Sequence, residues 1–188
     1  KLINSIQKEF GWPKRFVVST GKNMKERVIA VSEMLGDALN VAASLQSTDV
    51  NVLNNIKRDN ISLEALDTMR QETGEGGGDT YTELILGLPG DSEQAHTKTL
   101  KDVIDADMGV IRMYQLILLP QTELNTPLTR NTYEMKTKHR LMPRSFGKYE
   151  ILGKKFCAIE SEEICIENNS LPFNDYVKCR ELDMTVEI

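Results

Sequence analysis

The sequence predicts an α/β protein in which short parallel strands alternate with helices. Four apolar runs rich in branched residues carry this prediction, and they cover 16–19, 39–45, 80–88 and 110–119. Strands that alternate with helical patterns at this spacing are typical of βαβ units, whose strands pair in parallel. The runs are almost continuously apolar, which indicates strands that are buried on both faces.

The first predicted strand, 16–19, is followed by a helix that begins after Asn23. Asn23 and Glu26 have the spacing of a capping box. The apolar residues of 24–35 then recur at intervals of three and four, which places them on one helical face, and Gly36 ends the pattern. These features predict one strand–helix unit.

The second unit combines the strand 39–45 with a short helix over 50–57, joined by the polar residues 46–49. A further helical pattern begins at Ser62. The stretch 74–79 has four glycines in six residues, which predicts a flexible turn before the third strand.

The third strand leads through a glycine turn into a helix that we expect over 92–106. Gly87 and Gly90 let the backbone approach a ligand, and the start of the helix adds a positive dipole end. Asp91 is the expected N-cap, with Gln94 as its reciprocal partner. The turn matches neither the Walker nor the dinucleotide spacing, so its signal for phosphate binding is weak.

The fourth strand, 110–119, is the longest candidate and is stopped by Pro120. Beyond it the chain becomes polar, basic and irregular, and only 171–184 carries a helical prediction. We therefore expect an α/β part over 1–125 and an irregular α+β extension over 126–188.

Composition and charge favour a cytoplasmic protein that acts on a small molecule. Hydrophobic residues make up 40% and charged residues 27% of the 188 residues, and no apolar run reaches the roughly 18 residues of a membrane span. The first residues do not have the pattern of a secretory signal. The net charge of −5 is interspersed and forms no basic stripe for nucleic acid. We expect neither a membrane nor a nucleic acid as partner.

No metal centre and no catalytic residue stand out in the sequence. Cys157, Cys165 and Cys179 are an odd set without CxxC or CxxxC spacing, so a disulfide framework and a compact zinc site are both poor interpretations. His96 is expected on the solvent side or flank of its helix, and His139 lies in a basic tract. Such histidines are more often surface residues than metal ligands.

Polar residues follow each of the four predicted strands, at 19–20, 46–47, 87–91 and 121–122. Because the carboxyl ends of parallel strands meet at one edge of a sheet, these groups can line one site. Their donors, acceptors and exposed backbone suit a ligand with hydroxyl, amine and carboxylate groups. Taken one by one, the simpler account is that they cap helices.

Five segments give this pattern a more specific interpretation. They are 46–58 (QSTDVNVLNNIKR), 81–92 (YTELILGLPGDS), 114–124 (YQLILLPQTEL), 140–149 (RLMPRSFGKY) and 162–180 (EEICIENNSLPFNDYVKCR). Each segment is weak alone, but their order resembles the C-terminal portion of radical S-adenosylmethionine (SAM) enzymes, and more narrowly the branch with a cobalamin-binding domain.

The resemblance implies a partial (β/α)6 TIM-like barrel, with 1–125 supplying about strands three to six and 126–188 packing on it. It implies SAM and a 4Fe-4S cluster as cofactors, cobalamin as a further candidate, and a small-molecule substrate. Methyl transfer dependent on cobalamin is one reaction within its range.

The resemblance also assigns residues to the cofactor. The family's apolar residue and glycine that support the adenine map to Ile85 and Gly87, and the polar positions near the methionine or ribose map to Gln46 and Ser47. Together with the other strand positions, the candidate cofactor-binding residues are Ser19, Gln46, Ser47, Glu83, Ile85, Gly87 and Gln121.

Two departures from the family pattern qualify these expectations. The CxxxCxxC triplet that holds the cluster does not occur in the sequence, so we expect the cluster to come from a missing N-terminal half of the barrel and the chain alone to be inactive. Gln121 stands where the family's LLPGT pattern has glycine, which makes that turn less permissive.

Two other functions remain open. A non-catalytic α/β module could use the same strand ends to bind a nucleotide-like ligand. An aldolase-type barrel is disfavoured because no lysine lies at a strand end to form a Schiff base. The reading frame before Lys1 separates the first of these from a radical SAM enzyme, since a CxxxCxxC triplet is expected there only in the latter.

Overall fold

The structure, a computed structural model, describes residues 1–17, 27, 30–31, 34–35, 38–40, 44–58 and 81–187. In chain order its elements are α1 (Leu2–Phe10), β1 (Phe16–Val17), β2 (Leu39–Asn40), α3 (Val50–Asn55), β3 (Tyr81–Leu86), α5 (Glu93–Asp105), β4 (Val110–Gln115), the 3-10 helix η2 (Glu123–Asn125), α6 (Pro127–Thr132), β5 (Lys136–Ile151), β6 (Lys154–Glu167) and α7 (Phe173–Glu187). The helix expected from Ser62 and the turn over 74–79 lie outside the described residues, as does most of 24–35.

The predicted parallel pairing is confirmed for the described strands. β3 and β4 run parallel, with Tyr81 opposite Val110 and Leu86 opposite Gln115, and β1 and β2 also pair in parallel. Gln46, which follows β2, joins β3 through a parallel bridge to Leu84. The described strands form separate two-stranded sheets, so the partial barrel stays a prediction.

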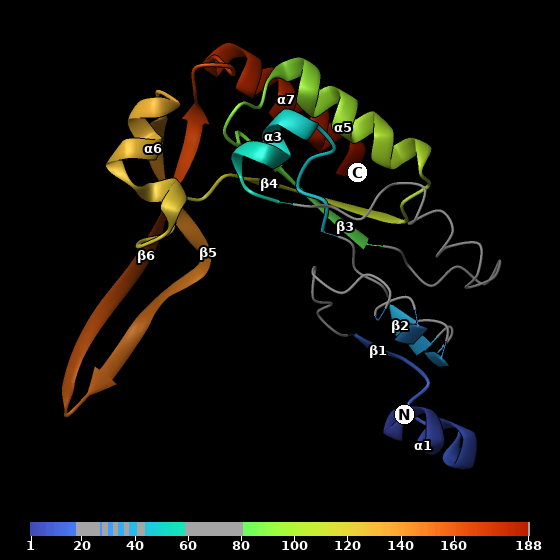
Figure 1. Ribbon diagram of the computed structural model, residues 1–188. Helices are drawn as coiled ribbons and strands as arrows, with labels where there is room; N and C mark the ends of the chain where they lie inside the picture. Colours follow the sequence, from blue (N-terminus) through green and yellow to red (C-terminus); the bar gives the residue numbers. More distant parts are fainter. Residues whose placement is uncertain are drawn as a thin grey trace.

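Helices α5 and α7 cover one face of β3 and β4 (Figure 1). Leu84 of β3 and Met113 of β4 pack there against Leu100 and Val103 of α5, and Leu182 of α7 closes the cluster. Residues of β3 alternate between buried and half-buried positions. Within the described residues, β3 is therefore fully buried on the face that α5 and α7 cover and half-buried on the other, so the expectation of full burial on both faces is not met there.

The turn between β3 and α5 differs from the expected capping box. Ser92 is the N-cap, since its hydroxyl accepts a hydrogen bond from the backbone N–H of Ala95 at 3.1 Å. Asp91 instead closes the turn, because its carboxylate accepts from the N–H groups of Gly87 and Ser92, both at 2.9 Å. The expected capping pair of Asp91 and Gln94 is therefore replaced by Ser92 as the N-cap.

His96 is buried, contrary to the expected surface position. Its side chain is 3% exposed, and its Nε2 lies 2.7 Å from Oδ1 of Asp183 on α7. The second oxygen of Asp183 accepts from Nη1 of Arg180 at 3.1 Å. Buried polar groups need such partners, so this pair fixes α7 against α5.

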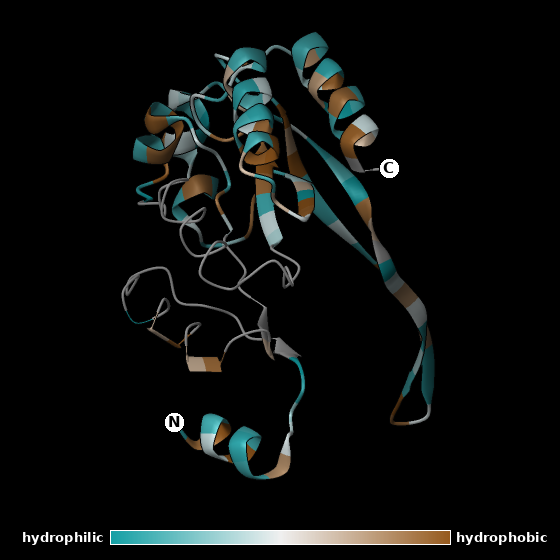
Figure 2. Ribbon diagram, turned by 90° about the vertical axis from the view of Figure 1, so that its right-hand side faces the viewer, coloured by the Kyte–Doolittle hydropathy of each residue, from teal (hydrophilic) through white to brown (hydrophobic). Residues whose placement is uncertain are grey.

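The residues after 135 form a long antiparallel hairpin, β5 and β6, which projects from the body (Figure 1). Only its base joins the rest of the sheet, through an antiparallel bridge between Ile117 and Ile164. The extension was expected to be irregular because its sequence is polar and basic. Most of the hairpin is exposed, including apolar residues such as Leu141, Phe146 and Ile159, and hydrophilic and hydrophobic residues are mixed along it (Figure 2).

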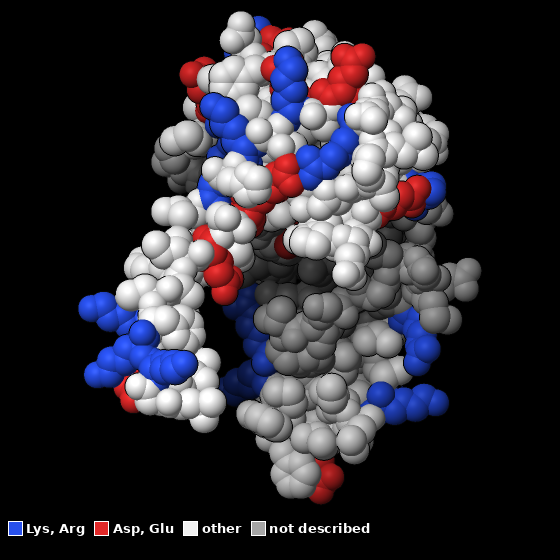
Figure 3. Space-filling view, turned by 90° about the vertical axis from the view of Figure 1, so that its left-hand side faces the viewer, with Lys and Arg blue, Asp and Glu red and all other residues white. Residues whose placement is uncertain are grey.

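Basic side chains gather near the tip of this hairpin (Figure 3), where the register places Lys148, Lys154 and Lys155. The predicted boundary at residue 125 falls between η2 and α6 and stays a prediction. Among the described residues, no helix has the length and apolar character needed to cross a membrane.

Candidate functional site

The segments that follow β2, β3 and β4 meet at the carboxyl edge of the parallel strands. Val52 of α3 packs there with Leu88, Leu116 and Leu118, which follow β3 and β4. The side-chain amide of Asn55 donates to the carbonyl of Pro89 at 3.1 Å. The edge predicted from the strand order is thus assembled in the structure.

The face of β3 and β4 opposite α5 and α7 carries polar side chains. Tyr81 and Glu83 lie on β3 at i and i+2, and therefore on the same face. Arg112 and Tyr114 are the register partners of Glu83 and Ile85, so they share that face. We call this surface, made by these five residues, the open face of the sheet.

Glu83 is the centre of a hydrogen-bond network on the open face. Its Oε2 accepts from the hydroxyl of Ser44 at 2.8 Å, and its Oε1 accepts from the hydroxyl of Tyr81 at 2.8 Å. Burial and the hydrogen bond to Glu83 raise the pKa of Tyr81, so that the phenol stays protonated and donates. Glu83 is thereby held in one orientation.

Arg58, three residues after α3, brings a positive charge to the same network. Burial lowers the pKa of Arg58, and the charge of Glu83 opposes this shift. Among the described residues, nothing accepts a hydrogen bond from its buried Nη1 atom. A buried donor without a partner costs about 1–3 kcal/mol, which makes an acceptor supplied by a ligand favourable here.

The candidate residues Gln46 and Ser47 follow Ser44 and Leu45 in the chain and lie next to β3. Gln46 is buried, and its backbone N–H donates to the carbonyl of Glu83 at 2.8 Å, while its own carbonyl accepts from Ile85 at 2.9 Å. Ser47 is also buried, but its hydroxyl lies 3.2 Å from that of Thr99 on α5 and accepts from the backbone of Asp49 at 3.1 Å. The hydroxyl of Ser47 is therefore already used within the fold.

Gly87 and Gln121 both have a left-handed backbone. Gly87 has φ 87°, and an added Cβ would meet only the carbonyl of Cys165 at 3.5 Å, so the conformation and not the space requires glycine. Gln121 is exposed with φ 64° in the turn after β4. The turn thus has the conformation that glycine suits at this position of the family pattern. Ser19 lies outside the described residues.

The described residues do not fit a 4Fe-4S cluster. They contain no group of three or more His, Cys, Asp or Glu side chains placed to hold a metal ion. Burial raises the pKa of Cys165, and it raises the pKa of Cys179 to about 12, so both remain thiols at neutral pH. Cluster iron binds thiolates. Cys157 is exposed on the hairpin, away from both.

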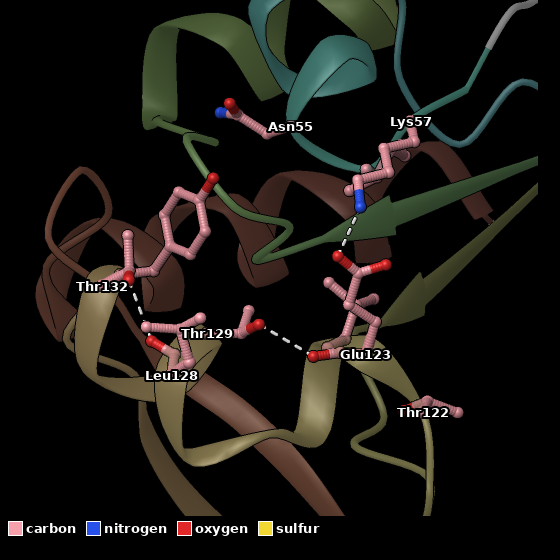
Figure 4. A pocket seen from close by; sticks show the side chains of 10 residues that line it. Asn55, Lys57, Thr122, Glu123, Leu128, Thr129 and Thr132 are labelled. Carbon is pink, nitrogen blue, oxygen red and sulfur yellow. Dashed lines mark hydrogen bonds and ion pairs between the residues drawn. The ribbon is translucent and has the colours of Figure 1, made fainter.

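A pocket of about 310 Å³ opens at the same carboxyl edge, between the end of α3, η2 and α6 (Figure 4). Nζ of Lys57 and Oε1 of Glu123 form an ion pair of 2.5 Å across it, and their side chains are 70% and 69% exposed. Lys57 lines the pocket, and the next residue, Arg58, lies near Glu83 of the open face.

Reasoning from the sequence missed Arg58, Ser44, Tyr81 and Tyr114 as members of the site. A signal existed for Arg58, since it ends the segment 46–58 that carries the family resemblance. Tyr81 and Tyr114 had the same signal, since they begin the segments 81–92 and 114–124, whereas Ser44 lies outside the five segments. The contacts of Tyr81 and Ser44 with Glu83 depend on the fold.

The sequence of the chain was compared with those of known proteins. No family model matches the chain. In sequence, however, it is similar to radical SAM methyltransferases, which confirms the resemblance to the cobalamin-dependent branch of the radical SAM superfamily.

Two relatives share 32% identity with the chain across 90% of its length. One is the cobalamin-dependent radical SAM methyltransferase TokK of Streptomyces tokunonensis, matched over 174 residues. The other is the 2-(S-pantetheinyl)-carbapenam-3-carboxylate methyltransferase of Streptantibioticus cattleyicolor, matched over 173 residues. The chain spans 25% of the length of each.

Among solved structures, the chain is similar to coproporphyrinogen III oxidase (HemN) from Escherichia coli, a radical SAM enzyme. The identity is 22% and the TM-score 0.42, over 49% of this chain and 22% of that chain.

Proposed function

We propose that the chain is part of a cobalamin-dependent radical SAM methyltransferase and holds SAM on the open face of β3 and β4. The observation that carries the proposal is the 32% identity to such an enzyme over 90% of the chain. The reaction would modify a small molecule, as the name of the second relative suggests, and we propose that it takes place in the cytoplasm.

The open face fits the chemical groups of SAM. The unpartnered guanidinium nitrogen of Arg58 suits the methionine carboxylate, because charge-assisted hydrogen bonds to carboxylates are strong. Glu83 offers acceptors to ribose hydroxyls or to the ammonium group, and Ile85 offers an apolar surface to the adenine. When bound, SAM would supply the methyl group and the radical chemistry.

The residues of this chain would position SAM and keep its charged groups paired. Tyr81 and Ser44 hold the Glu83 carboxylate in place before the ligand arrives. Such preorganisation lowers the entropy cost of binding. Among the described residues, no group of side chains is placed to hold the cluster. We propose that its ligands, and the cobalamin site, belong to a partner segment, the N-terminal half of the barrel, and that the chain alone is inactive.

Equilibrium dialysis of the chain with radiolabelled SAM tests the site. We expect Arg58→Met to weaken binding at least tenfold, because it removes a charge-assisted pair worth about 1.5–3 kcal/mol. Lys57→Met is the matched control, since it removes the neighbouring cation, which pairs with Glu123 instead. Equal binding by wild type and Arg58→Met would contradict the assignment.

The reading frame upstream of Lys1 tests the parent enzyme. A CxxxCxxC triplet roughly 100 residues before Lys1 is expected from a barrel that lacks its first strands. An initiator methionine with a ribosome-binding site directly before Lys1 would instead favour the non-catalytic module that binds a nucleotide-like ligand.

A further inference from the structure

We propose that Asn168 is a positioning residue for the adenosyl end of SAM, because it fixes the turn over 87–90 that follows β3. The inference rests on the proposed function and deepens it, since it makes the segment after β6 part of the same site. That segment lies within 162–180, which carries part of the family resemblance. The residues assigned to SAM, Arg58, Glu83 and Ile85, all lie outside it.

The side-chain amide of Asn168 is buried and uses both of its ends. Its Oδ1 accepts from the backbone N–H of Ser170, from the hydroxyl of Ser170 and from the backbone N–H of Leu171, each at 2.9 Å. Its Nδ2 donates to the carbonyls of Leu88 at 3.2 Å and Gly87 at 3.4 Å. Donors lie on one side and carbonyls on the other, so the contacts determine the orientation of the amide.

The turn after β3 is held by side chains from two separate segments. Gly87 has φ 87°, and glycine populates such conformations about as readily as the ordinary ones, so the sequence of the turn does not select this one by itself. The carboxylate of Asp91 accepts from the N–H of Gly87 at 2.9 Å, from within the same turn. Asn168 lies 81 residues further along the chain and binds the carbonyl side. Asn168 therefore fixes the turn relative to the rest of the fold.

Asn168 itself has a rigid support. Its backbone N–H donates to the carbonyl of Leu171 at 3.0 Å. Leu171 is fully buried and packs with Leu86, the last residue of β3. The amide is thus held at a fixed place beside the end of β3, where the turn begins.

The turn lies at the adenine end of the proposed site. Ile85, which would contact the adenine, precedes Gly87 by two residues, and consecutive Cα atoms are about 3.8 Å apart. Arg58, which would bind the methionine carboxylate, reaches the ligand from the segment after α3. A displaced turn should therefore change the contacts with the adenosine part of SAM and leave those with the methionine part.

Asn168→Asp removes the donor and keeps the shape of the side chain. Its second oxygen would face the carbonyls of Gly87 and Leu88, whereas Oδ1 could still accept from the backbone after it. Asn169→Asp is the matched control, since it makes the same change on an exposed amide that donates to the carbonyl of Thr132 at 3.4 Å. If circular dichroism shows that Asn168→Asp does not fold, Asn168→Ser takes its place, because a serine hydroxyl accepts locally from backbone N–H groups but is too short to reach the turn.

Hydrogen exchange of the ligand-free chain measures the turn itself. In Asn168→Asp we expect the N–H of Gly87 to exchange about tenfold faster than in wild type, because the turn opens more often. The N–H of Leu118, which donates to the carbonyl of Glu163 at 2.9 Å, should exchange at the wild-type rate. A global loss of stability would accelerate both amides.

5′-Methylthioadenosine separates the two ends of SAM, because it has the adenosine part without the carboxylate and ammonium groups of methionine. In equilibrium dialysis, Asn168→Asp should bind SAM and 5′-methylthioadenosine about threefold to tenfold more weakly than wild type, and by the same factor. Arg58→Met should weaken the binding of SAM alone. Asn169→Asp should bind both ligands as wild type does.

Unchanged exchange at Gly87, equal acceleration at Gly87 and Leu118, or unchanged binding of 5′-methylthioadenosine by Asn168→Asp would each overturn the inference. The two proposals fail in different ways. If wild type binds both ligands and Asn168→Asp binds them equally well, only the role of Asn168 is wrong. If wild type binds neither, the SAM site itself is wrong, and the role of Asn168 toward SAM falls with it, whatever the exchange at Gly87.

Discussion

Replacing Glu163 by glutamine removes the charge that joins β6 to α6. Nη1 and Nη2 of Arg130 donate to the two oxygens of Glu163 at 2.8 and 2.6 Å, and the hydroxyl of Thr137 donates to Oε1 at 2.5 Å. These donors lower the pKa of Glu163 from 4.5 to about 2. Arg130 also donates to Asn125, so the network holds η2 and α6, two walls of the pocket.

The lowered pKa sets both the sign and the size of the effect. A carboxyl whose pKa is lower in the folded state contributes stability above its unfolded pKa, and this contribution is lost as pH falls through the folded pKa. A shift from 4.5 to about 2 corresponds to about 3 kcal/mol. Because the Glu163 side chain is 20% exposed, we expect screening to reduce this to about 2 kcal/mol.

Urea unfolding, followed by far-ultraviolet circular dichroism, measures the free energy of unfolding of wild type and variant. The single Trp12 is 67% exposed and reports poorly on the core. Glu163→Gln should lower the free energy of unfolding by about 2 kcal/mol at pH 7, and the difference from wild type should shrink as pH falls from 4.5 to 2. Glu160→Gln, an exposed carboxyl on the same strand, should change it by less than about 0.5 kcal/mol. A difference that stays constant with pH would refute the reasoning.

Four further substitutions have predictable effects on stability. Gly90→Ala should lower the free energy of unfolding in urea by about 1–2 kcal/mol, because Gly90 has φ 82° and an added Cβ would lie 2.5 Å from Nδ2 of Asn55. Gly11→Ala is the comparison: Gly11 has φ 65° with open space around it, so the loss should be about 1 kcal/mol or less. His96→Leu should lower the free energy of unfolding by about 3 kcal/mol, because it leaves a buried carboxylate on α7 without that partner. Burial raises the pKa of Asp91 to about 6, so protonation of this group stabilises the folded state at low pH. The free energy of unfolding should therefore fall by up to about 3 kcal/mol as pH rises from about 4 to 6. In Asp91→Asn this dependence on pH should be absent in the same assay.

The parallel strands could be predicted because their signal is local. β3 and β4 both lie inside predicted apolar runs, but the runs extend further, since Leu88 and Leu116 pack in a core cluster after the strands end. The hairpin could not be predicted in the same way. Its strands are joined by contacts between distant residues, such as the ion pair of Arg140 with Glu162, and not by an apolar pattern.

The site was predictable only where strand order determines neighbours. Gln46 and Glu83 were both candidates, and the parallel bridge places them side by side. Arg58 was not a candidate, because a charged residue after a helix is usually solvated and nothing local shows that its guanidinium turns toward β3. His96 was misplaced for the same reason, since its partner Asp183 lies 87 residues further along the chain.

The base of the hairpin determines how the sheet can grow. Just beyond β4, the N–H of Leu116 donates to Leu86 on one side, and its carbonyl accepts from Cys165 on the other, both at 2.9 Å. Both hydrogen-bonding sides of the backbone at Leu116 are therefore paired, and no further strand can be added at that point. If β3 and β4 belong to a barrel, its wall on this side ends in a strand of opposite direction, and any entrance there runs along the foot of β6.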